Sequence, residues 1–115
     1  MKLIAEVKVM EANKNYWIKV DGHIFEVEPG NGSTFTLEEL QSAVGGFVEF
    51  VQVPGYYHIK RRDRNFKSRA IVCNDEGKLR SLPLNKLASD LAFDQLKVWD
   101  FICGDVLYVD SDTLV

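Results

Sequence analysis

The segment Cys73–Asn85, which reads CNDEGKLRSLPLN, concentrates the residue types that catalytic and metal-binding loops use. It holds a thiol, carboxylates, an amide and cations within a few positions. The same residues also make turns, because Asp75 tolerates turn geometry and Gly77 supplies a positive φ. We therefore interpret residues 74–77 as a hairpin connection. It joins a strand that ends at Cys73 to a return strand that begins at Lys78.

A second cluster is the basic segment 56–69, YYHIKRRDRNFKSR, which carries six of the chain's 14 basic residues and one acid. One interpretation is a solvated hairpin tip whose cations keep an edge soluble. The other is an anion site, because the guanidinium fork of arginine matches phosphate and carboxylate. The expected ligand-binding residues are Arg61, Arg62, Arg64 and Arg69, with Tyr57 and Phe66 placed to stack on a base.

Glu49 is an acid among apolar neighbours in GFVEFVQV, a predicted strand that is apolar on both faces. A buried carboxylate requires a partner or an altered pKa. Two interpretations stay open: a structural ion pair with an arginine or lysine, and a functional acid. We keep Glu49 as a candidate binding residue. In a weaker enzyme hypothesis, Glu49 and Asp105 act as acid and base.

The cysteines and histidines do not form a metal-binding pattern. Cys73 and Cys103 lie among apolar residues, which is typical of buried reduced thiols. His23 and His58 stand apart from both cysteines, whereas a zinc site needs ligands at short spacing. The sequence has no Gly-x-Ser-x-Gly element. We expect no metal, no cofactor, no catalytic residue and no enzymatic activity.

The bulk composition is that of one ordinary domain spanning residues 1–115. Hydrophobic residues make up 46% and the formal net charge is −3, which argues against a general nucleic-acid binder. No apolar run reaches the roughly 20 residues that span a bilayer. An acid and two lysines interrupt the first apolar segment, unlike a signal peptide. These features predict a cytoplasmic protein without membrane association.

Hydrophobic periodicity and turn residues predict the elements that position these clusters. Strands are expected at 2–10, 16–20 and 23–27, with a two-residue turn at Asp21–Gly22. Thr36 and Glu39 have the spacing of a capping box, and Gly45 is placed to end the helix that follows. Asn85 is a favourable N-cap for a second helix.

These elements indicate an α+β fold, in which two short helices pack on a mainly antiparallel, twisted sheet or partial barrel. The last strand is expected within 100–110, where Gly104 suggests a bulge or a close backbone approach. Edge strands rich in Val, Ile and aromatic residues favour self-pairing. We therefore expect a homodimer or larger homo-oligomer.

Four motifs occur in a fixed order: TLEELQSAVGGFVEFV, IVCNDEGKLRSLPLN, KLASDL and DFICGDVLYV. Together they resemble the phage- and plasmid-borne family called domain of unknown function 3846. The resemblance covers residues 36–109 as a family-like core and leaves an N-terminal strand hairpin and loop, 1–35, largely outside. It implies a small protein of a mobile element, located in the host cytoplasm if phage-encoded, and supplies no catalytic residues. The matching positions without an assigned structural role are Glu49, Glu76 and Asp105.

Two binding hypotheses follow. The first is a non-enzymatic accessory protein of a phage or mobile element that counteracts a host process, such as defence. It would bind either a nucleotide-like anionic ligand or a host protein. The alternative is single-stranded nucleic-acid binding through segment 56–69, since cations and aromatic rings suit unstacked bases. The acidic net charge argues against this alternative.

The basic segment yields a direct test. Replacing Arg61, Arg62 and Arg64 together with glutamine should leave the melting temperature nearly unchanged, because exposed charges contribute little to stability. It should weaken binding of a partner, a phosphate-bearing ligand or a labelled oligonucleotide by more than about 1.4 kcal/mol, a tenfold change. Binding that survives the triple replacement would identify the segment as a solvated loop.

Overall fold

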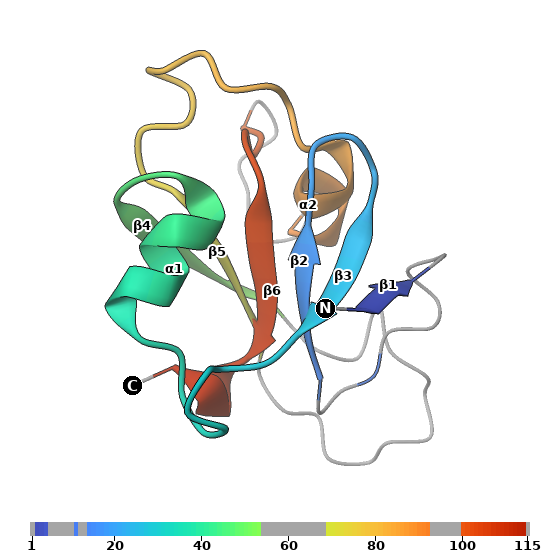
Figure 1. Cartoon of the computed structure of the whole chain (residues 1–115). Helices are drawn as coiled ribbons and strands as arrows, with labels where there is room; N and C mark the ends of the chain where they lie inside the picture. Colours follow the sequence, from blue (N-terminus) through green and yellow to red (C-terminus); the bar gives the residue numbers. More distant parts are fainter. Residues whose placement is uncertain (1, 5–10, 12–13, 54–68, 93–99, 115) are drawn as a thin grey trace.

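The computed structural model describes residues 2–4, 11, 14–53, 69–92 and 100–114. Six strands form one antiparallel open sheet in the order β1-β3-β2-β6-β5-β4 (Figure 1). The strands are β1 (Lys2–Ile4), β2 (Asn15–Ile18), β3 (Ile24–Val27), β4 (Val48–Val53), β5 (Arg69–Asn74) and β6 (Val106–Asp110). The predicted α+β class and antiparallel pairing are confirmed, and the sheet is open rather than a closed barrel.

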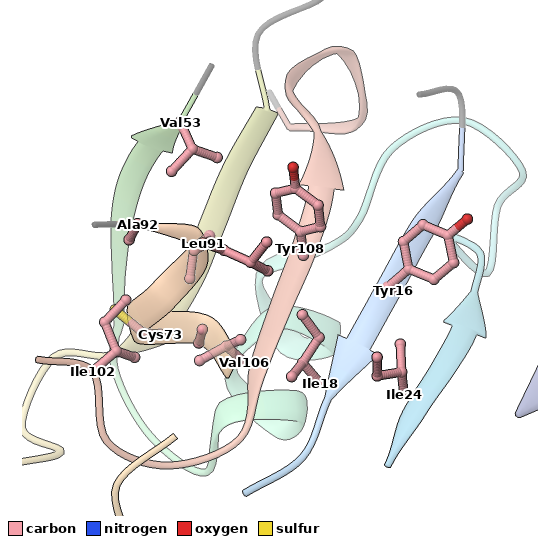
Figure 2. Packing of buried hydrophobic residues seen from close by; sticks show 12 residues of the cluster. Tyr16, Ile18, Ile24, Val53, Cys73, Leu91, Ala92, Ile102, Val106 and Tyr108 are labelled. Carbon is pink, nitrogen blue, oxygen red and sulfur yellow. The ribbon is translucent and has the colours of Figure 1, made fainter. Parts of the chain in front are cut away.

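The two helices belong to separate hydrophobic clusters. Leu40 and Val44 of α1 (Leu37–Val44) pack with Ala70, Val72 and other residues on one face of the sheet. The α2 helix (Lys86–Leu91) packs with the second cluster, which Figure 2 shows. Its members include Ile71, Cys73, Val106 and Tyr108. Because side chains alternate along a strand, β5 and β6 contribute to both clusters, and all their residues are buried.

The capping residues of both helices are those that the sequence predicts. Thr36 Oγ1 accepts from Glu39 N at 3.1 Å, and the Glu39 carboxylate accepts from Thr36 N at 2.9 Å. The helix ends at Gly45, whose φ of 78° lies in the left-handed region. Asn85 Oδ1 accepts from Ala88 N at the start of α2. Four orphan N–H groups begin every helix, so such caps fix where it starts.

The hairpin of β2 and β3 is also confirmed, but its turn is longer than predicted. Ile18 lies opposite Ile24, and Lys19 N donates to His23 O. A further bond from Gly22 N to Lys19 O leaves a three-residue loop with Gly22 at a φ of 93°. This is the type I turn followed by a left-handed residue. The Asp21–Gly22 pair therefore predicted the hairpin correctly, but the loop is one residue longer than predicted.

The predicted return strand from Lys78 is wrong. Residues 75–81 form consecutive turns, closed by bonds from Arg80 N to Glu76 O and from Leu82 N to Gly77 O. The reason lies in β5, which already pairs with β4 on one side and β6 on the other. With both edges of β5 occupied, a strand following directly has no place beside it. Among the described residues, this segment instead forms an isolated bridge from Leu84 to Cys103.

Asn85 supplies a stability test. Its side chain is buried and donates to Ile18 O at 3.0 Å and to Gly104 O at 2.9 Å, besides capping α2. Asn85→Ala should lower the free energy of unfolding by about 3 kcal/mol or more, because it removes side-chain hydrogen bonds to three backbone groups in the interior. Denaturant unfolding at constant m-value measures the loss.

Asn31→Ala is the matched control. The Asn31 side chain accepts from Ser33 N and Thr34 N but lies exposed, so water replaces both bonds. Asn31→Ala should lower the free energy of unfolding by less than about 1 kcal/mol. Equal losses in the two variants would contradict the structural role assigned to Asn85.

Candidate functional site

Most of the predicted basic site, including Tyr57, Arg61, Arg62, Arg64 and Phe66, lies outside the described residues. Arg69 is described, and its expected position on an exposed loop is wrong. It is the first residue of β5 and is fully buried.

The Arg69 guanidinium is held by backbone carbonyls. Nη2 donates to Lys14 O at 2.7 Å and to Tyr108 O at 3.0 Å, and Cζ lies 4.3 Å from the centre of the Tyr108 ring. Burial lowers the pKa of Arg69, but an arginine stays charged in proteins. Arg69 is thus a core cation that binds the segment before β2 to the sheet.

The predicted buried acid is exposed. Glu49 lies on β4, whose pattern of burial alternates only weakly because β4 is the last described strand on its side of the sheet. Asp105 is instead engaged by the β2–β3 hairpin: it accepts from Val20 N at 2.9 Å and lies 3.3 Å from Lys19 Nζ. Glu49 and Asp105 line different hollows, so the structure does not bring this acid–base pair together.

The segment Cys73–Asn85 contains a series of turns that side-chain hydrogen bonds hold in place. Asn74 Nδ2 donates to Val44 O at the end of α1, and Asn74 Oδ1 accepts from Glu76 N. A Cβ on Gly77 would lie 2.9 Å from Cys103 O, so only glycine allows this approach. With Glu49 and Asp100, the turn lines a hollow of about 350 Å³, where Lys78 pairs with Asp100.

Both cysteines are buried, as predicted. Burial raises the pKa of the Cys73 thiol to about 12, and the carboxylates of Glu49 and Asp75 act in the same direction. A nucleophilic cysteine needs the opposite shift. Among the described residues, no three His, Cys, Asp or Glu side chains gather closely enough to hold a metal ion.

A further hollow lies between α1 and the strands β2 and β3. It is a groove of about 940 Å³. Figure 1 shows α1 over β4, β5 and β6, with β2 and β3 beyond its edge, so α1 leaves this part of the sheet face uncovered. The apolar lining residues are Trp17, Val27, Phe35, Ala43 and Leu107.

Trp17 fixes the position of α1 beside the groove. Its indole Nε1 donates to Ala43 O at 3.1 Å, which ties β2 to the last turns of α1. The ring packs 6.0 Å from Phe25, and Lys19 Nζ lies 4.2 Å above it. A half-buried indole fixed by these contacts is a rigid aromatic part of the groove floor.

The rim of the groove is acidic. Glu28, Glu38 and Glu39 line it, and no lysine or arginine does so in the part of the chain that the structure describes. Bonds from the N–H groups of Thr36 and Gly30 lower the pKa of Glu39, so its carboxylate stays ionised. Glu26 borders the groove too, but its place opposite Tyr16 puts its side chain on the other face. There it pairs with Lys14 at 3.0 Å.

Sequence reasoning missed this groove. The capping box accounts for Glu39, the first turn of a helix favours acids such as Glu38 because of the helix dipole, and Glu28 belongs to a loop. A signal was present in EVEPGNGSTFTLEEL, which has four acids and no basic residue within 15 positions. Only the fold, however, shows that Trp17 and Leu107, 90 positions apart, form the floor between these acids.

Sequence comparison identifies the family. The family described as Domain of unknown function (DUF3846) matches residues 16–113. The chain belongs to DUF3846. The DUF3846 match begins within β2 and includes β3, so it extends further toward the N-terminus than the resemblance over residues 36–109. No curated protein and no solved structure matches the chain. In the part of this DUF3846 protein that the structure describes, no helix has the length and apolar character to cross a bilayer.

The thiol of Cys73 provides a pH test. Its pKa is raised on folding, so its contribution to stability is complete below about pH 9 and is lost as the pH rises through about 12. Between pH 8 and pH 10, the free energy of unfolding should fall about 1 kcal/mol further in the wild type than in Cys73→Ala. Denaturant titrations at the two pH values measure both slopes.

Iodoacetamide labelling of the native protein at neutral pH is the complementary measurement. Cys73 should react only after unfolding, because the thiolate is the reactive form. Rapid alkylation of Cys73 in the native protein would show that its thiol is activated. It would then support a catalytic role for this cysteine.

Proposed function

We propose that this DUF3846 protein is a non-enzymatic binding protein whose acidic groove receives a basic segment of another protein. The observation that carries the proposal is the groove itself, with an apolar floor and three carboxylates on its rim. Binding sites typically combine such a floor with a few polar groups that fix orientation. Apolar and cationic side chains of a partner would match the floor and the rim respectively.

The charge of the rim favours a protein partner over a nucleotide-like ligand. Glu28 and Glu38 are exposed on either side of the groove. Carboxylates repel phosphate and attract lysine and arginine, and complementary charge also speeds association. Of the two ligands that the sequence leaves open, the groove therefore supports the host protein.

The surroundings of Asp105 and Cys73 support a binding role over an enzymatic one. The carboxylate of Asp105 is occupied by Val20 N and Lys19 Nζ, and the thiol of Cys73 is kept protonated by burial. Neither group is poised for proton transfer or nucleophilic attack. The proposed mode of action is occlusion, in which the groove covers a basic surface that the partner needs.

The proposal extends to biological setting. Resemblance to a family carried by phages and plasmids suggests an accessory protein of a mobile element, acting in the host cytoplasm. A partner in a host process such as defence would then be blocked rather than chemically altered. A nucleic-acid role for segment 56–69 is a separate hypothesis, tested by the arginine replacements above.

The groove can be tested with a short fluorescein-labelled peptide of alternating lysine and leucine residues. Fluorescence anisotropy at low salt should show saturable binding by the wild type. The double variant Glu28→Lys/Glu38→Lys should bind at least about tenfold more weakly, because two attractive charges become repulsive. A peptide of alternating glutamate and leucine should not bind.

Asp75→Lys/Asp90→Lys is the matched control, since it changes the net charge equally at exposed positions outside the groove. It should retain most of the wild-type affinity. Equal weakening in both double variants would attribute the binding to net charge, and an unbound wild type would overturn the proposal.

A further inference from the structure

The floor of the acidic groove offers side chains but no strand edge. β2 and β3 form part of this floor, and both are already paired: β2 with β3 and β6, and β3 with β1 and β2. The hydrogen bonds of these ladders run between neighbouring strands, whereas the groove lies on the face of the sheet. An extended segment gains affinity by adding a strand to an open edge. In this groove it would find no such edge among the described strands.

The polar groups beside the groove also fail to match an extended backbone. The Trp17 indole N–H already donates to Ala43 O. The exposed carboxylates of Glu28 and Glu38 accept hydrogen bonds and donate none. Most C=O groups of an extended segment would therefore stay unpaired here, which is costly for groups taken out of water. An α-helix pairs its backbone groups internally and presents side chains alone, so the groove favours a helix.

The groove lies where a second helix would pack. α1 contacts β4, β5 and β6, and β2 lies two strands away from β5, the middle strand of these three. Neighbouring strands are about 4.8 Å apart, so this separation is about 10 Å. Packed helices lie about 8–10 Å apart, axis to axis. A helix beside α1 at this distance lies over β2, on the part of the sheet that Figure 1 shows beyond the edge of α1.

The size of the groove and the flank of α1 agree with this position. Two turns of helix, about 11 Å long and about 10 Å across, occupy about 850 Å³. The groove measures about 940 Å³. Ser42 and Ala43 line it from α1, and such small side chains allow two helices to approach closely.

We infer that the partner binds as an amphipathic helix packed beside α1, an inference that rests on the proposed function. Leu107, Trp17 and Phe25 lie opposite one another on β6, β2 and β3, and therefore share one face of the sheet. This apolar row receives the apolar stripe of the helix. Lysines or arginines on the flanks of the helix meet Glu28 and Glu38. The partner's apolar residues then recur at i, i+3, i+4 and i+7.

Two fluorescein-labelled peptides with equal numbers of lysine and leucine residues test the conformation. In the helix-patterned peptide, leucines recur at i, i+3, i+4 and i+7. In the other, lysine and leucine alternate, which is the pattern of a strand. Fluorescence anisotropy should show that the wild type binds the helix-patterned peptide at least about tenfold more tightly. Circular dichroism of this mixture should show more helix than the sum of its separate components.

A proline and an alanine at one peptide position form a matched pair. Replacing a central lysine of the helix-patterned peptide with proline should weaken binding at least about tenfold, because proline breaks a helix. Alanine at the same position removes the same charge but preserves the helix. It should change the affinity less than about threefold, because a single exposed charge contributes little. Equal effects of proline and alanine would overturn the inference.

Ser42→Trp tests the packing against α1. Ser42 is exposed, and serine and tryptophan have similar helix propensities, so the fold should be retained. The larger side chain should weaken binding of the helix-patterned peptide at least about tenfold, because it fills the space beside α1. Leu79→Trp is the control, since Leu79 is 86% exposed in the turn after β5 and does not line the groove. It should bind like the wild type.

The outcomes separate this inference from the proposed function. Equal or tighter binding of the alternating peptide, weakened by Glu28→Lys/Glu38→Lys, would overturn the helical mode and support the groove as a site for basic segments. Binding of neither peptide would overturn the proposed function and the inference with it. If sedimentation velocity showed self-association that Ser42→Trp abolished, with neither peptide bound, a second copy of the chain would be the occupant.

Discussion

The burial of β5 and β6 on both faces is the constraint on which the rest of the fold depends. Every residue of these two strands is buried, so both faces of the central sheet must be covered. α1 meets this requirement on one side and α2 on the other, each with its own hydrophobic cluster. The groove lies where α1 stops short of β2 and β3. The same constraint fills both edges of β5 and leaves β4 at the end of the sheet.

The burial of both sheet faces also limits which polar side chains the core can hold. A buried donor or acceptor without a partner costs about 1–3 kcal/mol, so each polar side chain inside must serve several backbone groups. Asn85 joins β2, Gly104 and α2, while Asn74 joins α1 to the turn after β5. Arg69 binds carbonyls of residues before β2 and within β6. Residues that look reactive in the sequence are thus the ones that hold distant segments together.

Local signals in the sequence predicted local structure well. The capping box of Thr36 and Glu39, the cap at Asn85 and the hairpin near Gly22 depend on contacts within a few residues, which a sequence displays directly. Glu49 and Arg69 were misplaced because their burial depends on where β4 and β5 lie in the sheet.

The strand expected from Lys78 failed for a related reason, since only sheet order reveals that β5 has no vacant edge. The groove could not be predicted from the sequence either. Its floor combines β2, β3, α1 and β6, and its acids each had an adequate local explanation.

The position of β6 has a consequence for how the chain folds during synthesis. β6 is the last strand along the sequence, yet it lies between β2 and β5 and is their only connection within the described sheet. The N-terminal hairpin and the β4–β5 pair therefore leave the ribosome as separate units with unfilled edges. Their strands become one sheet only when β6 has emerged. Such long-range pairing is slow, and it leaves the edges of both units unpaired until β6 is in place.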